Sequence, residues 1–310
     1  GEMLINPEVD AEDDIAWICD GCGQMLNIQP GFLGNCGEWK CTECGFLNMI
    51  DSSELYLSED EYQASLNDPY KGLSDEEMLS LTAYEEIEPV SGRKDIFLVK
   101  NRETGMFYTK KLLTIYDKSI YEYLIKSPIA HMPKICGIYE SSNCLIVIEE
   151  YIGGKTIDKL LEDGVFSPER AVSITKSICR ILDELHNLPI PIIHRDIKPS
   201  NIMIADDEVY LLDMNIAKWF VPGKTDDTKH MGTYNFAAPE QVGYGMSASS
   251  AKSDIYAMGM LLNVMLTGVF PKEKKAEGDL WPVIERCISL KVEERYTAKE
   301  LIVELDSIVG

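Results

Sequence analysis

The chain has 310 residues, of which 29 are basic and 52 acidic, so its formal net charge is −23, and 45% of its residues are apolar. This length exceeds one average domain, the apolar content is ample for a core, and the acidic balance makes nucleic acid and anionic membranes poor partners for the whole surface. No apolar run reaches the roughly 18 residues that span a bilayer and no charged-then-apolar leader is present, so we expect a soluble, cytoplasmic protein without a membrane segment.

Residues 1–16 are acidic and contain Pro7, which predicts a loosely packed lead-in. Residues 17–50 then contain two copies of the pattern W-x-C-x-x-C-G. In each copy a tight turn, eased by the glycine after the second cysteine, can aim two thiolates at one point, and two facing turns make a tetrahedral sulfur site. The repeat predicts a zinc site with the ligands Cys19, Cys22, Cys41 and Cys44 in a module that resembles a zinc ribbon.

Two other readings of the cysteines are disulfides and a redox pair. Disulfides do not suit a reduced compartment, and a redox C-x-x-C would need a thioredoxin-like βαβ context, which the sequence lacks. Cys36 breaks the symmetry of the repeat and is expected to be a loop thiol.

Residues 51–82 read as an acidic linker, since twelve acids but only one base, Lys71, lie between Asp51 and Glu88. The segments that begin at Ser58 and Ser74 each carry a glutamate three residues later, as capping boxes do, which predicts short helices. The linker is either solvated or an acidic strip that lies across a basic surface.

The segment from Ile192 to Asp213 holds polar residues that match the needs of phosphoryl transfer. That reaction needs a carboxylate to orient a hydroxyl, a cation to neutralise the moving phosphate, and an oxygen pair to hold magnesium. The segment supplies these groups in order: His194, Arg195, Asp196, Lys198, Asn201 and Asp213.

This segment resembles the catalytic loop and metal-binding strand of eukaryotic-type, bacterial-like protein kinases, and DIKPSN is typical of their Ser/Thr branch. Further motifs follow in the family's order: LIVIEEYIGG (145–154), GTYNFAAPEQ (232–241), SDIYAMG (253–259) and EERYTA (293–298). The resemblance implies an α+β, two-lobed protein-kinase-like fold, with a small β-rich lobe at 83–150 and a large helical lobe at 151–310, after the zinc-ribbon module.

The resemblance also implies roles for single residues. Asp196 resembles the catalytic base and Lys198 the phosphate-neutralising lysine, while Asn201 and Asp213 resemble the magnesium ligands. The nucleotide, ATP, is expected to meet Gly92 in the phosphate loop and the hinge residues Glu150 and Ile152.

The phosphate loop departs from the family because Val90–Asp95 has a single glycine, so we expect Arg93 or Lys94 to compensate as side-chain cations. After Asp213 the family has Phe-Gly, whereas this chain has Met214 and Asn215. Asparagine tolerates a positive φ, so we expect the turn to survive at Asn215.

Strand alternation favours Lys111 over Lys110 as the lysine that grips the α- and β-phosphates, because Lys111 shares a face with small Thr109. Its partner acid on the helix expected at 116–126 falls on Asp117, with Glu122 as the alternative.

Glu149 aligns with the usually apolar gatekeeper position behind the adenine, unless the alignment is off by one residue. A carboxylate there should be protonated or reach a cation such as Lys111. We therefore expect Glu149→Met to tighten ATP binding or to leave it unchanged.

In the activation segment, Thr225 and Thr228 are candidate phosphorylation sites, and Thr233 resembles the threonine that contacts the catalytic aspartate. Arg195 resembles the arginine that often receives an activation-loop phosphate. Asp254 should anchor the catalytic loop, and the family's buried ion pair is expected between two further residues, Glu240 and Arg295.

The sequence thus predicts an ATP- and magnesium-dependent serine/threonine protein kinase that transfers the γ-phosphate to hydroxyl groups of an unidentified protein. The alternative is a pseudokinase that binds nucleotide or acts as a scaffold, with the zinc ribbon recruiting a partner. Phosphorylation of a small molecule is a third reading, because only a very short helix fits between Gly268 and Leu280, where the family builds a docking helix.

Overall fold

The computed structural model describes residues 2–5, 15–33, 37–50, 55–56, 64, 66–221, 235–242 and 249–309. The chain divides into two compact units, Gly1–Gly72 and Leu73–Gly310. Several residues singled out in the sequence lie outside the described ranges: Cys36, Ser58, Thr225, Thr228 and Thr233.

The described residues of the first unit form two small sheets. Three strands, in the order β2 (Ile15–Ile18), β1 (Glu2–Ile5) and β5 (Leu55–Tyr56), form one, and β3 (Gly37–Lys40) pairs antiparallel with β4 (Leu47–Ile50) to form the other. Part of the expected loosely packed lead-in is therefore a strand, because residues 2–5 pair antiparallel with β2.

The core of this unit is small and aromatic. Trp17, Leu26 and Ile50 are buried, and Phe32 makes edge contacts with Trp17 (6.3 Å between ring centroids) and with Trp39 (5.5 Å). Two of the cysteines, Cys19 and Cys41, belong to the same buried cluster.

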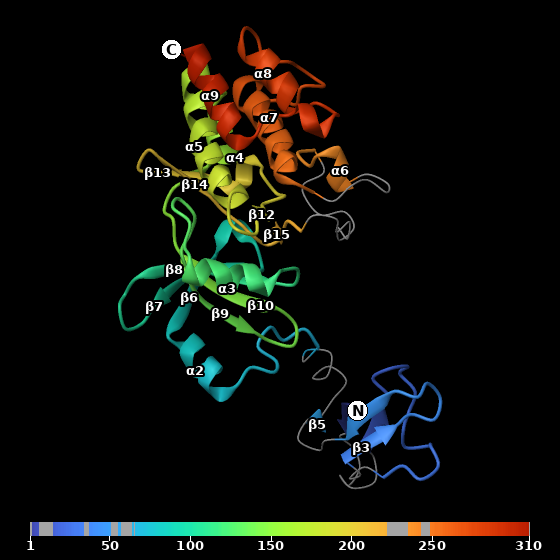
Figure 1. The fold of residues 1–310 in the computed structure, drawn as a ribbon. Helices are drawn as coiled ribbons and strands as arrows, with labels where there is room; N and C mark the ends of the chain where they lie inside the picture. The colour runs from blue at the N-terminus through green and yellow to red at the C-terminus, as the bar shows by residue number, and fades with distance from the viewer. Residues whose placement is uncertain are drawn as a thin grey trace. The chain divides into compact units, whose positions relative to one another are not determined.

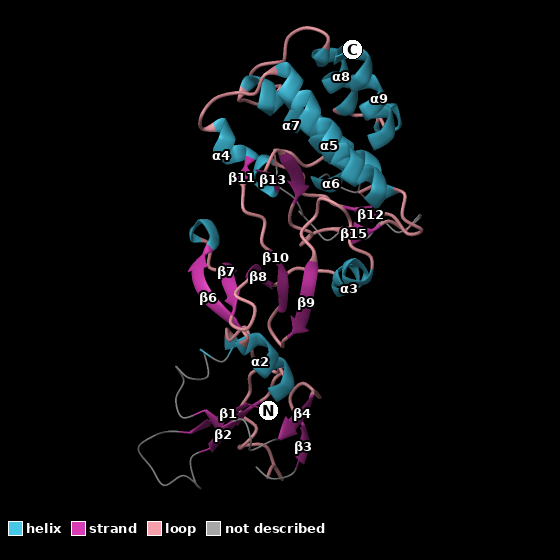
Figure 2. Cartoon of the chain, turned by 90° about the vertical axis from the view of Figure 1, so that its left-hand side faces the viewer, coloured by secondary structure: helices cyan, strands magenta, loops and turns pink. Residues whose placement is uncertain are grey.

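The second unit begins with helix α2 (Asp75–Thr82), whose start is the predicted capping box: the Ser74 hydroxyl accepts from the Glu77 amide, and the Glu77 carboxylate accepts from the Ser74 amide. A five-stranded antiparallel sheet follows, in the spatial order β6 (Tyr84–Pro89), β7 (Ile96–Asn101), β8 (Phe107–Leu113), β10 (Leu145–Glu150) and β9 (Ile135–Glu140). Helix α3 (Lys118–Lys126) follows β8 in the chain and packs beside β9 (Figure 2).

Helices dominate the rest of this unit (Figure 1), with bounds α4 (Ile157–Leu161), α5 (Pro168–His186), α6 (Pro239–Val242), α7 (Ala251–Thr267), α8 (Leu280–Cys287) and α9 (Ala298–Val309). Short strands lie at the side that faces the sheet of the small lobe: β11 (Lys155–Thr156), β12 (Ile192–Ile193), β13 (Ile202–Ala205), β14 (Glu208–Leu211) and β15 (Lys218–Trp219). The described part of the unit also contains three short 3₁₀ helices, η1 (Val90–Gly92), η2 (Pro199–Asn201) and η3 (Val292–Glu294).

Helix α5 forms the centre of the large lobe, where it packs against α7 and α9. It begins as predicted, with the Ser167 hydroxyl accepting from the Arg170 amide and Pro168 in the first turn, where a missing N–H costs nothing. Between Gly268 and Leu280 the chain forms turns and no α-helix. None of the described helices is long and apolar enough to cross a membrane. The two-lobed fold is thus the one the sequence predicts.

Candidate active site

The catalytic loop is anchored from below by Asp254 on α7. Its carboxylate is buried and accepts hydrogen bonds from the backbone amides of His194 (2.9 Å) and Arg195 (2.8 Å). It also lies 2.8 Å from Nε2 of His186. Burial alone would raise the pKa of Asp254, but these hydrogen bonds and the His186 and His194 charges outweigh burial and lower it. A charged carboxylate therefore fixes the loop that carries Asp196.

Asp196, Lys198 and Asn201 lie together in this loop. The Asn201 amide donates to Asp196 Oδ2 (2.9 Å) and to the Asp196 carbonyl (2.8 Å), and Lys198 Nζ lies 3.1 Å from Asp196 Oδ2. Because the Nδ2 group of Asn201 is used by Asp196, its Oδ1 atom is the one suited to a metal. The loop thus combines a carboxylate, a cation and a neutral oxygen.

Asp213 follows β14 and is held by the same loop, since the Leu212 amide donates to the Asn201 carbonyl (2.8 Å). Its φ is +65°, and its Oδ1 accepts from the Asn215 amide (3.1 Å). The expectation of a positive φ at Asn215 is wrong, since the left-handed residue is Asp213. Aspartate tolerates that conformation because its short side chain can hydrogen-bond locally, as it does here.

Lys111 is paired with Glu149, not with an acid of α3. Its Nζ lies 2.7 Å from Glu149 Oε1, and both side chains are buried. Asp117 instead caps α3 by accepting from the Ser119 amide (3.0 Å), and Glu122 is exposed. Both sequence candidates for the lysine's partner are therefore wrong, whereas the expected contact of Glu149 with Lys111 is present.

Lys110 points to the opposite face of β8, where it pairs with Glu86 and lies 5.6 Å from the Phe97 ring. Strand alternation thus separates the two lysines as the sequence suggested, and it leaves Lys111 on the face that feels the charge of Asp213.

The expected phosphate loop is the 3₁₀ turn η1, in which Ser91 (φ +52°) and Gly92 (φ +70°) are left-handed. Arg93 follows and forms a two-point ion pair with Asp95, with distances of 3.0 Å from Nε and 2.7 Å from Nη2. After the hydrogen bond and the charge of Asp95, the charges of Asp213 and Asp196 also raise the pKa of Arg93. The guanidinium therefore lies within the electrostatic reach of Asp196, the predicted catalytic base, and of Asp213, a predicted magnesium ligand.

The expected hinge lies at the end of β10. Glu150 is exposed, its amide donates to the Lys134 carbonyl (2.8 Å), and Ile152 is half-buried in the segment that leads to β11. Gly154 is required here, because a Cβ atom would lie 2.3 Å from the carbonyl oxygen of Ile204.

The Arg195 side chain is buried, and its Nε and Nη2 atoms find no hydrogen-bond partner among the residues that the structure describes. Burial lowers its pKa, and burial together with the Arg195 charge lowers the pKa of Lys218 to about 8. Arg195 and Lys218 thus interact as like charges, and a bound anion beside them would be favoured. Arg295 and Glu240 form the expected buried ion pair, with oxygen–nitrogen distances of 2.6 and 3.1 Å.

In the first unit the four predicted zinc ligands converge. The Sγ atoms of Cys19, Cys22, Cys41 and Cys44 all lie within 4.8 Å of one another, with separations of 3.6 Å for Cys19 to Cys44 and 3.8 Å for Cys22 to Cys41. Zinc–sulfur bonds of about 2.3 Å in a tetrahedron require sulfur atoms about 3.8 Å apart. The described cysteines are free thiols, so the cluster is compatible with a zinc ribbon.

Both turns have the same geometry. The amides of Gly23 and Gly45 donate to the carbonyls of Cys19 (2.8 Å) and Cys41 (2.9 Å), and both glycines have positive φ, +73° and +75°. Because only glycine adopts this conformation without strain, the repeat's final glycine is explained.

Two buried amides support the thiols and were not found from the sequence. Gln29 Nε2 donates to Cys41 Sγ (3.2 Å), and Asn48 Nδ2 donates to Cys19 Sγ (3.5 Å). The Gln29 hydrogen bond lowers the pKa of Cys41 to about 6, which favours the thiolate that metal requires.

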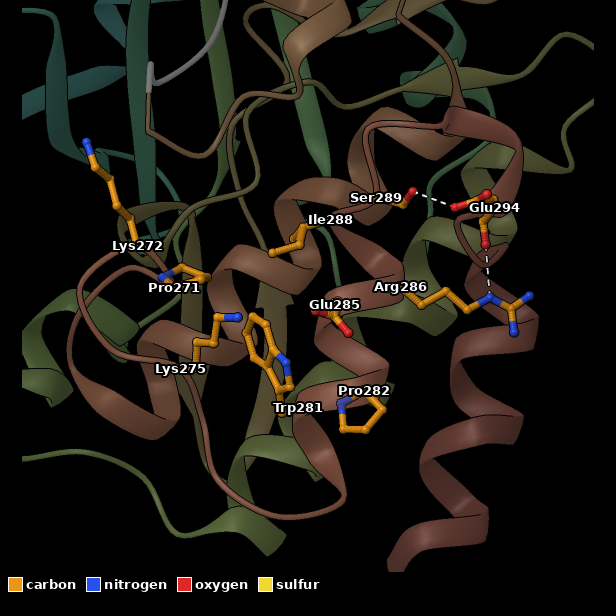
Figure 3. Close-up of a pocket in the computed structure, with 10 residues that line it drawn as sticks. All are labelled: Pro271, Lys272, Lys275, Trp281, Pro282, Glu285, Arg286, Ile288, Ser289 and Glu294. Atoms are coloured by element: carbon orange, nitrogen blue, oxygen red, sulfur yellow. Dashed lines mark hydrogen bonds between the residues drawn. The ribbon is translucent and has the colours of Figure 1, made fainter.

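A pocket of the second unit lies among residues 271–294, away from the candidate catalytic residues (Figure 3). It has a volume of about 780 Å³, and Trp281, with Lys275 Nζ 4.5 Å from its ring, stands on one wall. None of the candidate catalytic residues lines it, so it is not the proposed nucleotide site.

Sequence reasoning also missed three residues that support the site. They are His186, whose Nε2 lies 2.8 Å from Asp254 Oδ2, Gln241, whose side-chain amide donates to the Arg195 carbonyl (2.9 Å), and Tyr121, whose hydroxyl donates to Asn215 Oδ1 (3.3 Å). Tyr121 could have been found, because it falls on the apolar face of α3 with Ile120 and Leu124.

Comparison with known proteins agrees with this geometry. The chain is similar to Serine/threonine-protein kinase PEPKR2 of Arabidopsis thaliana, with 29% identity over 180 residues, which are 56% of this chain and 37% of that protein. It is also similar to Calcium-dependent protein kinase 5 of Oryza sativa subsp. japonica, with 30% identity over 196 residues, which are 54% of this chain and 35% of that protein. The chain thus spans little more than a third of the length of these relatives. The family model described as Protein kinase domain matches residues 95–303, more than half of the chain. The chain therefore belongs to the protein kinase family.

Proposed function

We propose that this chain is an ATP- and magnesium-dependent serine/threonine protein kinase. The observation that carries the proposal is the position of Asp196, whose carboxylate lies within hydrogen-bond distance of Asn201 and Lys198 in a loop fixed by buried Asp254. The names of the curated relatives, serine/threonine and calcium-dependent protein kinases, support the same reaction class. The substrate would be a protein hydroxyl group.

In the proposed reaction the hydroxyl oxygen of the substrate forms a bond to the γ-phosphorus of ATP while the bond between that phosphorus and the β–γ bridging oxygen breaks. Asp196 orients the hydroxyl and accepts its proton, and ADP leaves. Lys198 and Arg93 neutralise charge on the phosphates, and Lys111 holds the α- and β-phosphates.

Asn201 and Asp213 would hold magnesium. Their amide and carboxylate oxygens are the hard ligands that this ion prefers. Magnesium bound there would neutralise the triphosphate.

We also propose that Cys19, Cys22, Cys41 and Cys44 bind one zinc ion, since their sulfur spacing and the Gln29 and Asn48 amides suit a metal thiolate site. Recruitment of a protein partner by this unit, and residence in the cytoplasm, remain part of the proposal. The pseudokinase alternative is not retained, because neither the family match nor the names of the relatives support it.

Transfer of labelled phosphate from ATP to a generic basic protein and to the chain itself tests the function. Asp196→Ala should abolish transfer yet keep ATP binding, because its role belongs mainly to the transition state. Asp213→Ala should also lose magnesium-dependent binding. With one glycine in its phosphate loop, the wild type should turn over at the low end of the usual ~1–100 s⁻¹ or below it.

The matched control is Asp163→Ala, which removes an exposed carboxylate of the same lobe and should transfer phosphate like the wild type. Nucleotide binding that does not need magnesium, together with phosphate transfer no higher than that of Asp196→Ala, would contradict the proposed kinase activity.

A further inference from the structure

In active protein kinases the nucleotide-binding lysine pairs with an acid on the helix that follows its strand, and the position of that helix controls the pair. In this chain the corresponding helix is α3, and neither of its nearby acids serves the lysine. Asp117 is occupied as the N-cap, and Glu122 lies exposed on the helix surface. The lysine must therefore be held from elsewhere.

The partner comes from the neighbouring strand of the same sheet. In the register of β8 and β10, Lys111 lies opposite Val147 and Thr109 lies opposite Glu149. Lys111 and Glu149 are thus diagonal neighbours on one face of the sheet, a spacing that long side chains can bridge. Their charged atoms are 2.7 Å apart, and the two side chains are only 6% and 8% exposed.

The electrostatics of this pair involve a third charge. Burial alone would lower the pKa of Lys111, but the charges of Glu149 and Asp213 outweigh burial and raise it. Burial, with the charge of Asp213 added, raises the pKa of Glu149 against the opposing effect of Lys111. One buried cation therefore lies in the field of two carboxylates, and Glu149 is the one in direct contact.

Helix α3 is connected to a different part of the site. The Tyr121 hydroxyl donates to Asn215 (3.3 Å), Trp219 Nε1 donates to the Ser119 hydroxyl (2.8 Å), and the Tyr123 and Trp219 rings meet edge to face at 5.3 Å. All of these contacts reach the segment that follows Asp213, and none reaches Lys111.

We propose that Glu149 is the positioning residue of Lys111, and that it replaces the helix acid by a partner within the sheet. This inference rests on the proposed function, because it assigns Lys111 to the phosphates of ATP. It follows that the lysine stays in place whatever the position of α3, and that α3 acts on the turn at Asp213 instead. The earlier expectation for Glu149→Met is thereby reversed: the loss of the carboxylate should weaken ATP binding.

The test compares ATP with adenosine, which has the base but no phosphates, by titration of the full chain with magnesium present. Glu149→Gln keeps the side-chain volume and removes the charge, which frees Lys111 to turn toward Asp213. We expect ATP affinity to fall about tenfold or more, equivalent to about 1.4 kcal/mol, while adenosine affinity stays near the wild-type value. Glu149→Asp, which restores the charge one carbon short, should recover part of the ATP affinity.

A double-mutant cycle shows whether Glu149 acts through the lysine. Lys111→Met should weaken ATP binding by itself, and adding Glu149→Gln to it should cause little further loss, because the partner is already gone. The double variant also lacks the buried unpaired carboxylate that threatens the fold of Lys111→Met, so it remains measurable, and thermal unfolding checks each chain.

The control is Glu140→Gln, which removes the carboxylate charge that pairs with Lys118 of α3 (2.6 Å) and leaves β8 untouched. Its ATP affinity should match the wild type. Equal losses of ATP and adenosine in Glu149→Gln, wild-type ATP affinity in that variant, or a large ATP loss in Glu140→Gln would each overturn the inference. If the wild-type chain binds ATP but transfers no phosphate, the proposed function is overturned. The ATP and adenosine affinities of Glu149→Gln relative to the wild type would still decide the role of Glu149.

Discussion

Several buried charges among the described residues are met by a specific partner. Glu240 is one of these, because it accepts from Arg295 Nη1 (2.6 Å), Arg295 Nη2 (3.1 Å) and the Ser253 hydroxyl (2.8 Å). The removal of one member leaves the other charged and desolvated, which is costlier than never burying the pair. Each such pair therefore commits two distant segments to one arrangement, here α6 and the chain before α9.

This pair gives the kinase unit a defined pH dependence. Burial alone would raise the pKa of Glu240, but the Arg295 and Ser253 hydrogen bonds outweigh burial and hold it below the ordinary 4.5. A lowered folded pKa means that the stabilisation is present above about pH 4.5 and is lost as the pH falls through the folded value. In Glu240→Gln we expect a loss of about 3 kcal/mol at pH 7 and a weaker loss of stability on acidification, measured by urea unfolding at a series of pH values.

Glu162→Gln is the control, since Glu162 pairs with Lys159 on the exposed surface and solvent screens that pair. It should unfold like the wild type at every pH. If the free energy of unfolding fell as steeply with decreasing pH in Glu240→Gln as in the wild type, Glu240 would not be the cause of that pH dependence.

At the scale of elements, the packing of α7 explains how the catalytic loop is held. Most residues of α7 are buried, including Asp254, which anchors the loop, and Gly259, which lies one turn further along. A Cβ atom on Gly259 would come within 2.5 Å of Cys287 Cβ and 2.8 Å of Ile288 Cγ2. The glycine therefore lets α7, the helix that carries Asp254, approach the end of α8 closely.

Gly259→Ala tests that contact. Alanine gains about 1 kcal/mol in helix propensity over glycine, but overpacking a buried contact costs about 1–3 kcal/mol. Because both contacts would be shorter than 3.0 Å and Cys287 is buried, we expect the overpacking cost to exceed the propensity gain, with a net loss of up to about 2 kcal/mol in urea unfolding.

Ser173→Ala, on the exposed face of α5, measures the propensity gain without a packing change and should be neutral or slightly stabilising. A Gly259→Ala chain that is more stable than the wild type would mean that α7 and α8 move apart without cost.

At the scale of the whole molecule, the two units differ in what holds them together. The kinase unit has a continuous core that includes side chains from both lobes, whereas the core described in the first unit consists of Trp17, Leu26, Ile50 and two buried cysteines, with Phe32 and Trp39 packed against it. So small a core cannot offset the conformational entropy of the chain, and metal binding can supply on the order of 10 kcal/mol. The first unit should thus depend on zinc, and the kinase unit should not.

We predict one zinc per chain by elemental analysis, and loss of the first unit's fold on chelation while ATP binding persists. Calorimetry should show one transition that disappears with chelator and one that remains. Cys41→Ser should lose zinc, and Cys136→Ser, which removes an exposed thiol of the kinase unit, should keep it. A full complement of zinc in Cys41→Ser, or simultaneous unfolding of both units, would contradict the prediction.

Local patterns in the sequence were sufficient for features whose cause is local. The capping box at Ser74, the start of α5 at Ser167 and the paired cysteine turns each depend on residues within about five positions, and the structure contains all of them. Strand alternation likewise separated Lys111 from Lys110, because the two-residue period of a strand holds wherever the strand pairs. The two-lobed fold was predicted from the order of the kinase-like motifs along the sequence.

Tertiary structure decided which side chains became partners. Neither Asp117 nor Glu122 pairs with Lys111. Asp117 accepts a hydrogen bond from the Ser119 amide as the N-cap of α3, and Glu122 lies on the exposed face of the helix. Glu149 and His186 find their partners on strands or helices far apart in the chain, and Gln29 finds Cys41 in a separate turn of the first unit. The positive φ fell on Asp213 because its carboxylate meets the Asn215 amide there. Sequence determined the local conformations and the chemistry available, whereas the register and packing of distant elements determined which groups meet.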